Sequence, residues 1–315
     1  MNQEQENLYN ELTFKYNFNE SQKALIKNGI ISGIDVSIYA KLEYNQNQME
    51  QILLGLKDNL DVSCYLNPEF TYGQMDEIRL GLICGLKVDI YAKPEFDCGQ
   101  MYQIRSGLMS NLDVSIYAKQ EFNWKQMAQI NEGLLYGLNV DLYAKPEFNE
   151  WQMSQIYFGL KNKININSYL NPFINWSQMR EIRFGLEKGL DVSVYAKLEF
   201  NDLQMSEIRE GLEDGLDVIS YATVEFNWAQ MREIRFGLKN NLDISVYANS
   251  EFTWEQMEQI RLGLEQDLDI SIYLNPNMSW EEMKKSREYM LEIKNKTPIK
   301  IIPNNYLYGI IKRIK

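Results

Sequence analysis

The sequence predicts an all-α fold: an α-solenoid of ten 26-residue helix–short-helix repeats followed by a C-terminal capping helix. Three observations lead to this prediction. A large apolar residue recurs every 26 residues without insertion or deletion, a helix-capping pair follows it, and a glycine occupies one fixed place in every full copy. Self-similarity at a fixed period of this length is typical of solenoids, in which each copy is one supersecondary unit.

The period divides the chain into four segments. Residues 1–17 form an N-terminal cap, 18–277 the ten repeats, 278–297 a capping repeat and helix, and 298–315 a basic, apolar tail. Because stacked repeats share one core, we expect a single continuous domain. Position 1 of the successive copies is Phe18, Tyr44, Phe70, Phe96, Phe122, Phe148, Ile174, Phe200, Phe226, Phe252 and Met278.

A helix is expected to begin at position 3 of each copy. Position 2 is always Asn, Thr, Asp or Ser, and position 5 is Gln in ten copies and Glu282 in the last. This spacing is that of a capping box, in which the two side chains satisfy each other's backbone N–H groups. Met at position 6 and the usual Ile at position 9 share one helix face, which we expect to be core.

Glycine at position 12 runs from Gly29 to Gly263 in all ten full copies. Glycine inside a helix costs about 1 kcal/mol relative to alanine. We therefore expect another backbone or a large ring to approach too closely for a Cβ atom. At position 16, Gly or Asn in eight copies indicates a left-handed helix end, from which Lys163 and Asp267 depart.

The second half of each copy reads L-D-V-S-I-Y-A and allows two interpretations. Alternation of apolar and polar residues would permit a short strand and an α/β horseshoe. The apolar residues at positions 19, 22 and 23 instead share a helix face, with the usual Asp at position 18 as N-cap. The sequence favours the short helix, and the strand remains the alternative.

Composition limits the classes of function. The net charge is −12, with no histidine and only three cysteines, which have no metal-binding spacing. We expect no enzyme, no cofactor and no metal, since the usual general base is missing and no nucleotide-binding motif occurs. No apolar run is long enough to span a membrane, membrane binding is not expected, and cysteine use fits a reducing, cytoplasmic setting in which the thiols are at least half-buried.

The acidic body also argues against direct nucleic-acid binding, which needs positive charge. A protein partner that is basic or handles nucleic acid would fit better. Two sets of side chains could contact it. Arginine recurs at position 10 as Arg79, Arg105, Arg183, Arg209, Arg235 and Arg261, although the Asp at position 18 offers these side chains an internal ion pair instead. Tryptophan recurs at position 3 as Trp124, Trp176, Trp228, Trp254 and Trp280, where it could bind a partner or seal the space between repeats.

Two further regions are candidates. Copies 5 and 6 depart from the pattern, most clearly at Tyr157 and Lys163, and local irregularity can mark function or simple drift. The tail carries Lys312 and Arg313 among apolar residues, so it could cap the last repeat or recruit an acidic partner.

The consensus Q-M-x-x-I-R-x-G-L-x-x-G-L-D-V-S-x-Y-A resembles a repeat of uncharacterised proteins of low-GC Gram-positive bacteria and their mobile elements. The resemblance covers residues 18–274 and implies no particular activity. A mobile-element origin would imply a possible anti-defence role.

The sequence therefore predicts a non-enzymatic scaffold that binds a protein partner along an extended solenoid face. One alternative is an acidic inhibitor that mimics nucleic acid and blocks a bacterial defence nuclease. The other is a structural spacer without a partner.

Overall fold

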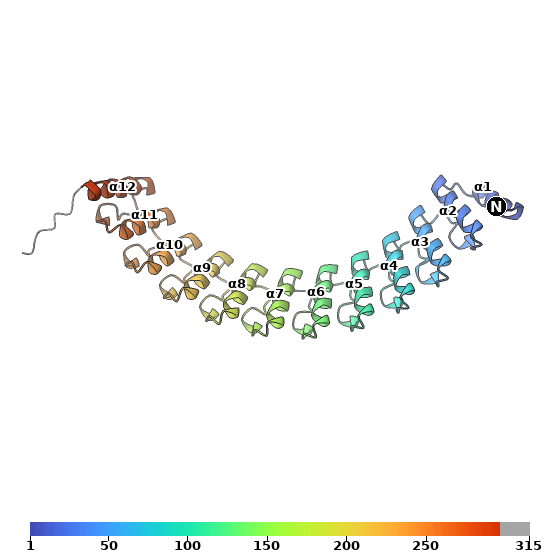
Figure 1. Ribbon diagram of the computed structural model, residues 1–315, viewed down its shortest axis with the longest axis horizontal. Helices are drawn as coiled ribbons and strands as arrows, with labels where there is room; N and C mark the ends of the chain where they lie inside the picture. Colours follow the sequence, from blue (N-terminus) through green and yellow to red (C-terminus); the bar gives the residue numbers. More distant parts are fainter. Residues whose placement is uncertain (297–315) are drawn as a thin grey trace, which may run out of the picture. The chain divides into compact units, whose positions relative to one another are not determined.

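The computed structural model describes residues 1–296, and within this range it is all-helical, without a strand (Figure 1). The chain forms two compact units, Met1–Pro172 and Phe173–Lys315, and each is described by itself. The α-solenoid prediction is confirmed, and the α/β horseshoe is wrong for this part of the chain. The tail candidates Lys312 and Arg313 lie outside the described residues.

In the first unit, consecutive α-helices pack against one another, and a short 3-10 helix follows each from α2 onward. The α-helices are α1 (Gln3–Lys15), α2 (Glu20–Ile31), α3 (Gln46–Lys57), α4 (Tyr72–Ile83), α5 (Cys98–Met109), α6 (Trp124–Leu135) and α7 (Glu150–Lys161). The 3-10 helices are η1 (Val36–Ile38), η2 (Val62–Tyr65), η3 (Val88–Ile90), η4 (Val114–Ile116), η5 (Val140–Leu142) and η6 (Ile166–Ser168).

The second unit repeats the same arrangement. Its α-helices are α8 (Trp176–Glu187), α9 (Asp202–Glu213), α10 (Trp228–Lys239), α11 (Trp254–Glu265) and α12 (Trp280–Lys296), and its 3-10 helices are η7 (Val192–Val194), η8 (Val218–Ser220), η9 (Ile244–Val246) and η10 (Ile270–Ile272). The helix of copy 11, α12, has 17 residues, whereas the repeat helices have 12.

The capping box forms in every repeat helix and also joins neighbouring copies. In α8, the Asn175 side chain accepts from the N–H of Gln178, whose Oε1 accepts from the N–H of Asn175. The same Gln178 side chain donates from Nε2 to the carbonyl of Phe200, 2.6 Å away in the next copy. One glutamine thus caps its own helix and ties the start of the following repeat to it.

The core of each unit is a stack of identical layers. Methionine at position 6 and isoleucine at position 9 are fully buried, as Met179 and Ile182 illustrate. Tyrosine at position 22 is also fully buried. The hydroxyl of Tyr195, which follows η7, donates to the carbonyl of Glu181 in α8, 3.2 Å away. This ring explains the glycine ladder, because a Cβ on Gly185 would lie 2.0 Å from the Tyr195 hydroxyl oxygen.

The end of each repeat α-helix at position 16 and the start of most 3-10 helices at position 18 have the predicted conformation and cap. Position 16 is left-handed in all ten copies, including Lys163 (φ 58°) and Asp267 (φ 50°), where glycine is absent. The aspartate at position 18 caps the 3-10 helix, as Asp191 does by accepting from the N–H of Ser193 at 3.0 Å. Of the three thiols, only Cys64 is partly buried, and the expectation for Cys84 and Cys98 is wrong because both lie exposed.

Candidate functional site

The position-10 arginines lie between neighbouring helices rather than on an open face. Arg183, Arg235 and Arg261 are buried, and Arg209 is only 12% exposed at its side chain. Their partners are the residue at position 8 of the preceding copy and, in several copies, the glutamate at position 14. The distance from the arginine Nε to a carboxylate oxygen is 2.7 Å for Arg105 and Glu77, 2.9 Å for Arg209 and Glu181, 2.9 Å for Arg235 and Glu207, and 2.8 Å for Arg261 and Glu233.

The expected ion pair with the position-18 aspartate is therefore wrong in its partner. Asp191 accepts from the 3-10 helix that it caps, and the hydroxyl and the N–H of Ser193 hold the pKa of the Asp191 carboxyl below its usual range. Where position 8 is glutamine, its amide oxygen takes the same role, as Gln51 does for Nε of Arg79 at 3.1 Å. The arginine ladder joins successive repeats.

In the second unit, a tryptophan pair is joined by an arginine of the chain itself. The guanidinium carbon of Arg232 lies 5.3 Å from the ring centroid of Trp228 and 5.7 Å from that of Trp254. Arg232 Nε is buried without a hydrogen bond, although Glu233 lies 3.5 Å away. Contact with two rings on neighbouring helices thus accounts for its position, and here the tryptophans contact an arginine of the chain itself.

In the first unit, α6 and α7 place two tryptophans around an open groove. The groove has a volume of about 230 Å³, and its walls include Trp124, Ala128, Glu150 and Trp151. The two indoles are 45% and 55% exposed. Position 7 of the copy that contains α6 is Ala128, where the copy that contains α10 has Arg232. This groove is a candidate binding site in residues 1–172.

One cation already lies at the edge of this groove. Lys125 Nζ is 5.8 Å from the centroid of the Trp124 ring and 3.6 Å from a carboxylate oxygen of Glu150. The Lys125 side chain is half exposed. The groove therefore combines two indoles with one carboxylate, and the half-exposed Lys125 ammonium lies near both kinds of group.

Two further exposed aromatic side chains, Tyr136 and Phe158, lie in the same two copies. Lys161 Nζ lies 3.9 Å from the centroid of the Tyr136 ring and donates to the Tyr157 hydroxyl at 3.0 Å. The Tyr157 ring is buried, and its hydroxyl donates to Glu132 at 2.9 Å, while Tyr136 and Phe158 are exposed. We call Trp124, Tyr136, Trp151 and Phe158 the aromatic surface.

The sequence indicated this region only in part. The irregular copies 5 and 6 include Tyr157, but that side chain is buried and contacts the rings of Tyr136 and Phe158. Trp151 was missed because it stands at position 4, one residue away from the tryptophan ladder. Lys163 is exposed at a left-handed helix end and takes no part in the groove. Among the other ladder tryptophans, Trp176 and Trp280 are partly exposed in the second unit.

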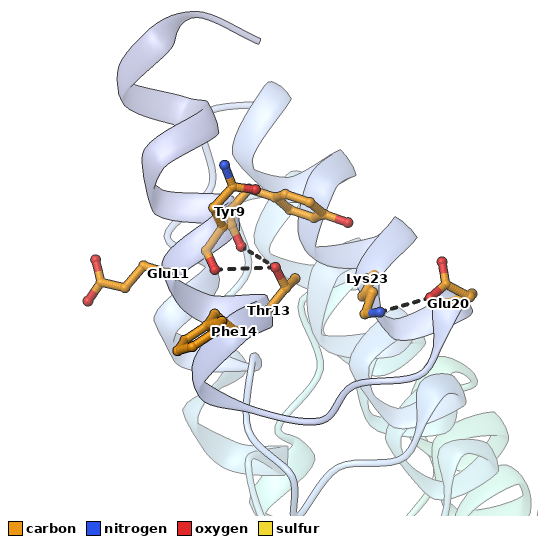
Figure 2. A pocket seen from close by; sticks show the side chains of 7 residues that line it. Tyr9, Glu11, Thr13, Phe14, Glu20 and Lys23 are labelled. Atoms are coloured by element: carbon orange, nitrogen blue, oxygen red, sulfur yellow. Dashed lines mark hydrogen bonds and ion pairs between the residues drawn. The ribbon is translucent and has the colours of Figure 1, made fainter.

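A second cavity, of about 740 Å³, lies between α1 and α2 (Figure 2). Tyr9 points from α1 toward α2, whereas Glu11 points away from it. Lys23 pairs with Glu20 at 2.8 Å, and the Thr13 hydroxyl donates to the Tyr9 carbonyl at 2.8 Å. We assign no ligand to this open cavity at the flank of the N-terminal cap.

Comparison with known proteins adds no assignment: the chain matches no protein-family model, no curated protein and no solved structure. Among the helices of residues 1–296, none is both long enough and apolar enough to cross a membrane.

Proposed function

We propose that this chain is a non-enzymatic repeat scaffold and that it binds a protein partner on the aromatic surface of α6 and α7. The observation that carries the proposal is the pair Trp124 and Trp151, both about half exposed around a groove. Tryptophan and tyrosine supply most of the binding energy at protein interfaces, where they enter or form pockets. Large aromatic side chains that are about half exposed on a helix pair are therefore a reason to expect a partner.

Charge and thiol state extend the proposal. The net charge of −12 favours association with a basic partner, including one that itself handles nucleic acid. Cys84 and Cys98 are exposed and free, which suits a reducing compartment, and we place the function in the cytoplasm on that ground.

The test compares proteins retained from a lysate of the source cell by three immobilised chains. These are the wild type, the Trp124→Ala/Trp151→Ala double variant, and Trp280→Ala as a matched loss of a partly exposed tryptophan. We expect a partner that the wild type and Trp280→Ala retain and the double variant loses. Retention of every protein by the double variant, with unchanged helical circular dichroism, would refute binding at this surface.

A nucleic-acid mimic is the second candidate, because exposed carboxylates recur in two rows. One row is aspartate at position 18, such as Asp191 and Asp217, and the other is glutamate at position 26, such as Glu199 and Glu225. Such an anti-defence inhibitor would bind the basic cleft of a nuclease and would be released as salt screens the charges. A complex that persists at about 1 M salt, where the Debye length is about 3 Å, would exclude the interpretation as a nucleic-acid mimic.

A further inference from the structure

We infer that the groove between α6 and α7 binds an arginine side chain of a basic protein segment, which stacks against Trp124 and Trp151 and faces the Glu150 carboxylate. The inference rests on the proposed function and names the chemistry that this site would recognise.

The chain itself shows how arginine occupies such a place. Arg232, at position 7 of α10, lies within 5.7 Å of the ring centroids of Trp228 and Trp254 on neighbouring helices. At the same position α6 has Ala128, and beside it is a groove of about 230 Å³ with a tryptophan on each of its two helices. The first unit thus has an indole on each of two adjacent helices, with alanine at the position that arginine takes in the second unit.

The second wall of the groove differs in a way that favours an external cation. In α11 the order at positions 3 and 4 is Trp254 then Glu255, whereas in α7 it is Glu150 then Trp151. Glu150 lines the groove together with Trp151. A carboxylate can pair with a guanidinium through two parallel hydrogen bonds, which gives arginine an advantage over lysine.

Lys125 supports this assignment because it already places a cation near the carboxylate and one indole of the groove. Its ammonium lies 3.6 Å from Glu150 and 5.8 Å from the Trp124 ring centroid. It reaches the groove from an exposed part of α6, so an incoming arginine can displace it. The net charge of residues 1–172 is negative, with 21 Asp or Glu against 14 Lys or Arg, which adds a longer-range attraction for a basic segment.

The experiment measures binding of a labelled peptide of alternating glycine and arginine by fluorescence anisotropy at about 0.15 M salt, where charges more than about 8 Å apart are largely screened. A peptide of equal length and charge with lysine in place of arginine is the first comparison. We expect the arginine peptide to bind the full chain about tenfold more tightly, as stacking and a bidentate pair would give. Equal affinity for the two peptides would overturn the inference.

Two variants fill the groove from within. Ala128→Arg recreates the position of Arg232, and Ala128→Met fills the same space without charge. Both are expected to weaken binding of the arginine peptide about tenfold, one by self-stacking and one by occlusion. If Ala128→Met binds the peptide as the wild type does, then charge alone attracts the peptide and the groove is not its site. Unchanged thermal unfolding of both variants shows that the fold is intact.

A third variant acts in the opposite direction. Lys125→Ala removes the competing ammonium and is expected to strengthen binding several-fold, whereas Lys119→Ala removes an equal charge from a loop outside the groove and is expected to change binding little. Equal effects of the two substitutions would count against displacement of Lys125 from the site. If the peptide fails in all of these respects while the lysate partner still depends on Trp124 and Trp151, the proposed function stands and the arginine inference falls.

Discussion

A Cβ atom on Gly185 would lie 2.0 Å from the hydroxyl oxygen of Tyr195 and 2.9 Å from Cγ1 of Val192. The glycine ladder is therefore a set of docking points for the tyrosines of the 3-10 helices. In every copy but the last full one, where the Tyr273 hydroxyl is buried without a hydrogen bond, the tyrosine hydroxyl passes the glycine and donates to a carbonyl of the same copy's α-helix, here that of Glu181. The conserved spacing of ten residues from Gly185 to Tyr195 holds the second half of a copy against the first.

Gly185→Ala is expected to lower the free energy of unfolding by about 3 kcal/mol, because the ring and the helix must move apart. Urea unfolding followed by circular dichroism measures the effect. The double variant Gly185→Ala/Tyr195→Phe should recover part of the loss, since it removes the nearest clashing atom. Gly189→Ala is not a suitable control because Gly189 has φ 72°, and Gly99→Ala is not one either, because its Cβ atom would lie 2.9 Å from Cγ of Trp124. A neutral Gly185→Ala would refute the docking role of the ladder.

Gln178→Glu tests the double role of the capping glutamine. The carboxylate can still accept from the N–H of Asn175. In the wild type the Phe200 carbonyl accepts from Gln178 Nε2 at 2.6 Å, and the substitution replaces this donor with a second acceptor. We expect a loss of about 2 kcal/mol at neutral pH in urea unfolding. The chain provides its own control: Glu282 stands at this position in the last copy, where no further repeat follows, so Glu282→Gln should change stability little. Equal effects of the two substitutions would contradict the cross-repeat role.

The long-range register was the part of the fold that sequence reasoning did not reach. The helices, their caps and the glycine ladder could be predicted because the signals lie within one copy. The arginine partners could not be found there, because the pair joins position 10 of one copy to position 8 of the copy before. The signal was present: Glu77, Glu181, Glu207 and Glu233 are each followed 28 residues later by an arginine. The groove was missed for a different reason, since Trp151 is displaced by one residue and only the three-dimensional structure places it beside Trp124.

Alkaline pH should unfold the protein steeply. Burial raises the pKa of the position-22 tyrosines, to about 12 for Tyr273 and further for Tyr117, Tyr143 and Tyr195. Their folded-state pKa thus exceeds the unfolded value of about 10, so their contribution to stability is complete below pH about 10 and is lost as pH rises toward the folded value. Each such tyrosine withdraws up to about 1.4 kcal/mol per pH unit in that window.

The measurement is tyrosinate absorbance recorded together with helical circular dichroism during alkaline titration. We expect the buried tyrosines to ionise in the same transition in which the helix signal disappears. Ionisation of all tyrosines with the helix signal retained would show that the rings are accessible to base in the folded state, contrary to the structure.

Lys163→Gly should raise stability by about 1 kcal/mol, because an L-residue with a Cβ atom is strained at φ 58°. The thermal midpoint would rise accordingly. Gly189→Lys is the reciprocal substitution at the same position of the next copy, and it should lower stability by a similar amount. No change in either variant would indicate that the Lys163 side chain contributes a contact equal to the backbone strain.

Arg235→Ala should destabilise the second unit in a pH-dependent way. The substitution leaves the buried Glu207 carboxylate without the guanidinium that lies 2.9 Å away, and breaking such a pair costs about 3 kcal/mol. Burial already raises the pKa of Glu207, and loss of Arg235 would raise that pKa further. Since the folded-state pKa then exceeds the unfolded one, the folded variant binds the proton more tightly, and its deficit is largest above the folded pKa and shrinks as pH falls. Urea unfolding at about pH 7 and about pH 5 measures this change.

The control is the double variant Arg235→Ala/Glu207→Gln. It should show a smaller loss of stability that does not vary with pH, because glutamine cannot ionise and is already the residue at position 8 of several copies. A pH-independent deficit in the single variant would mean that packing of the arginine stem, rather than the ion pair, joins the repeats.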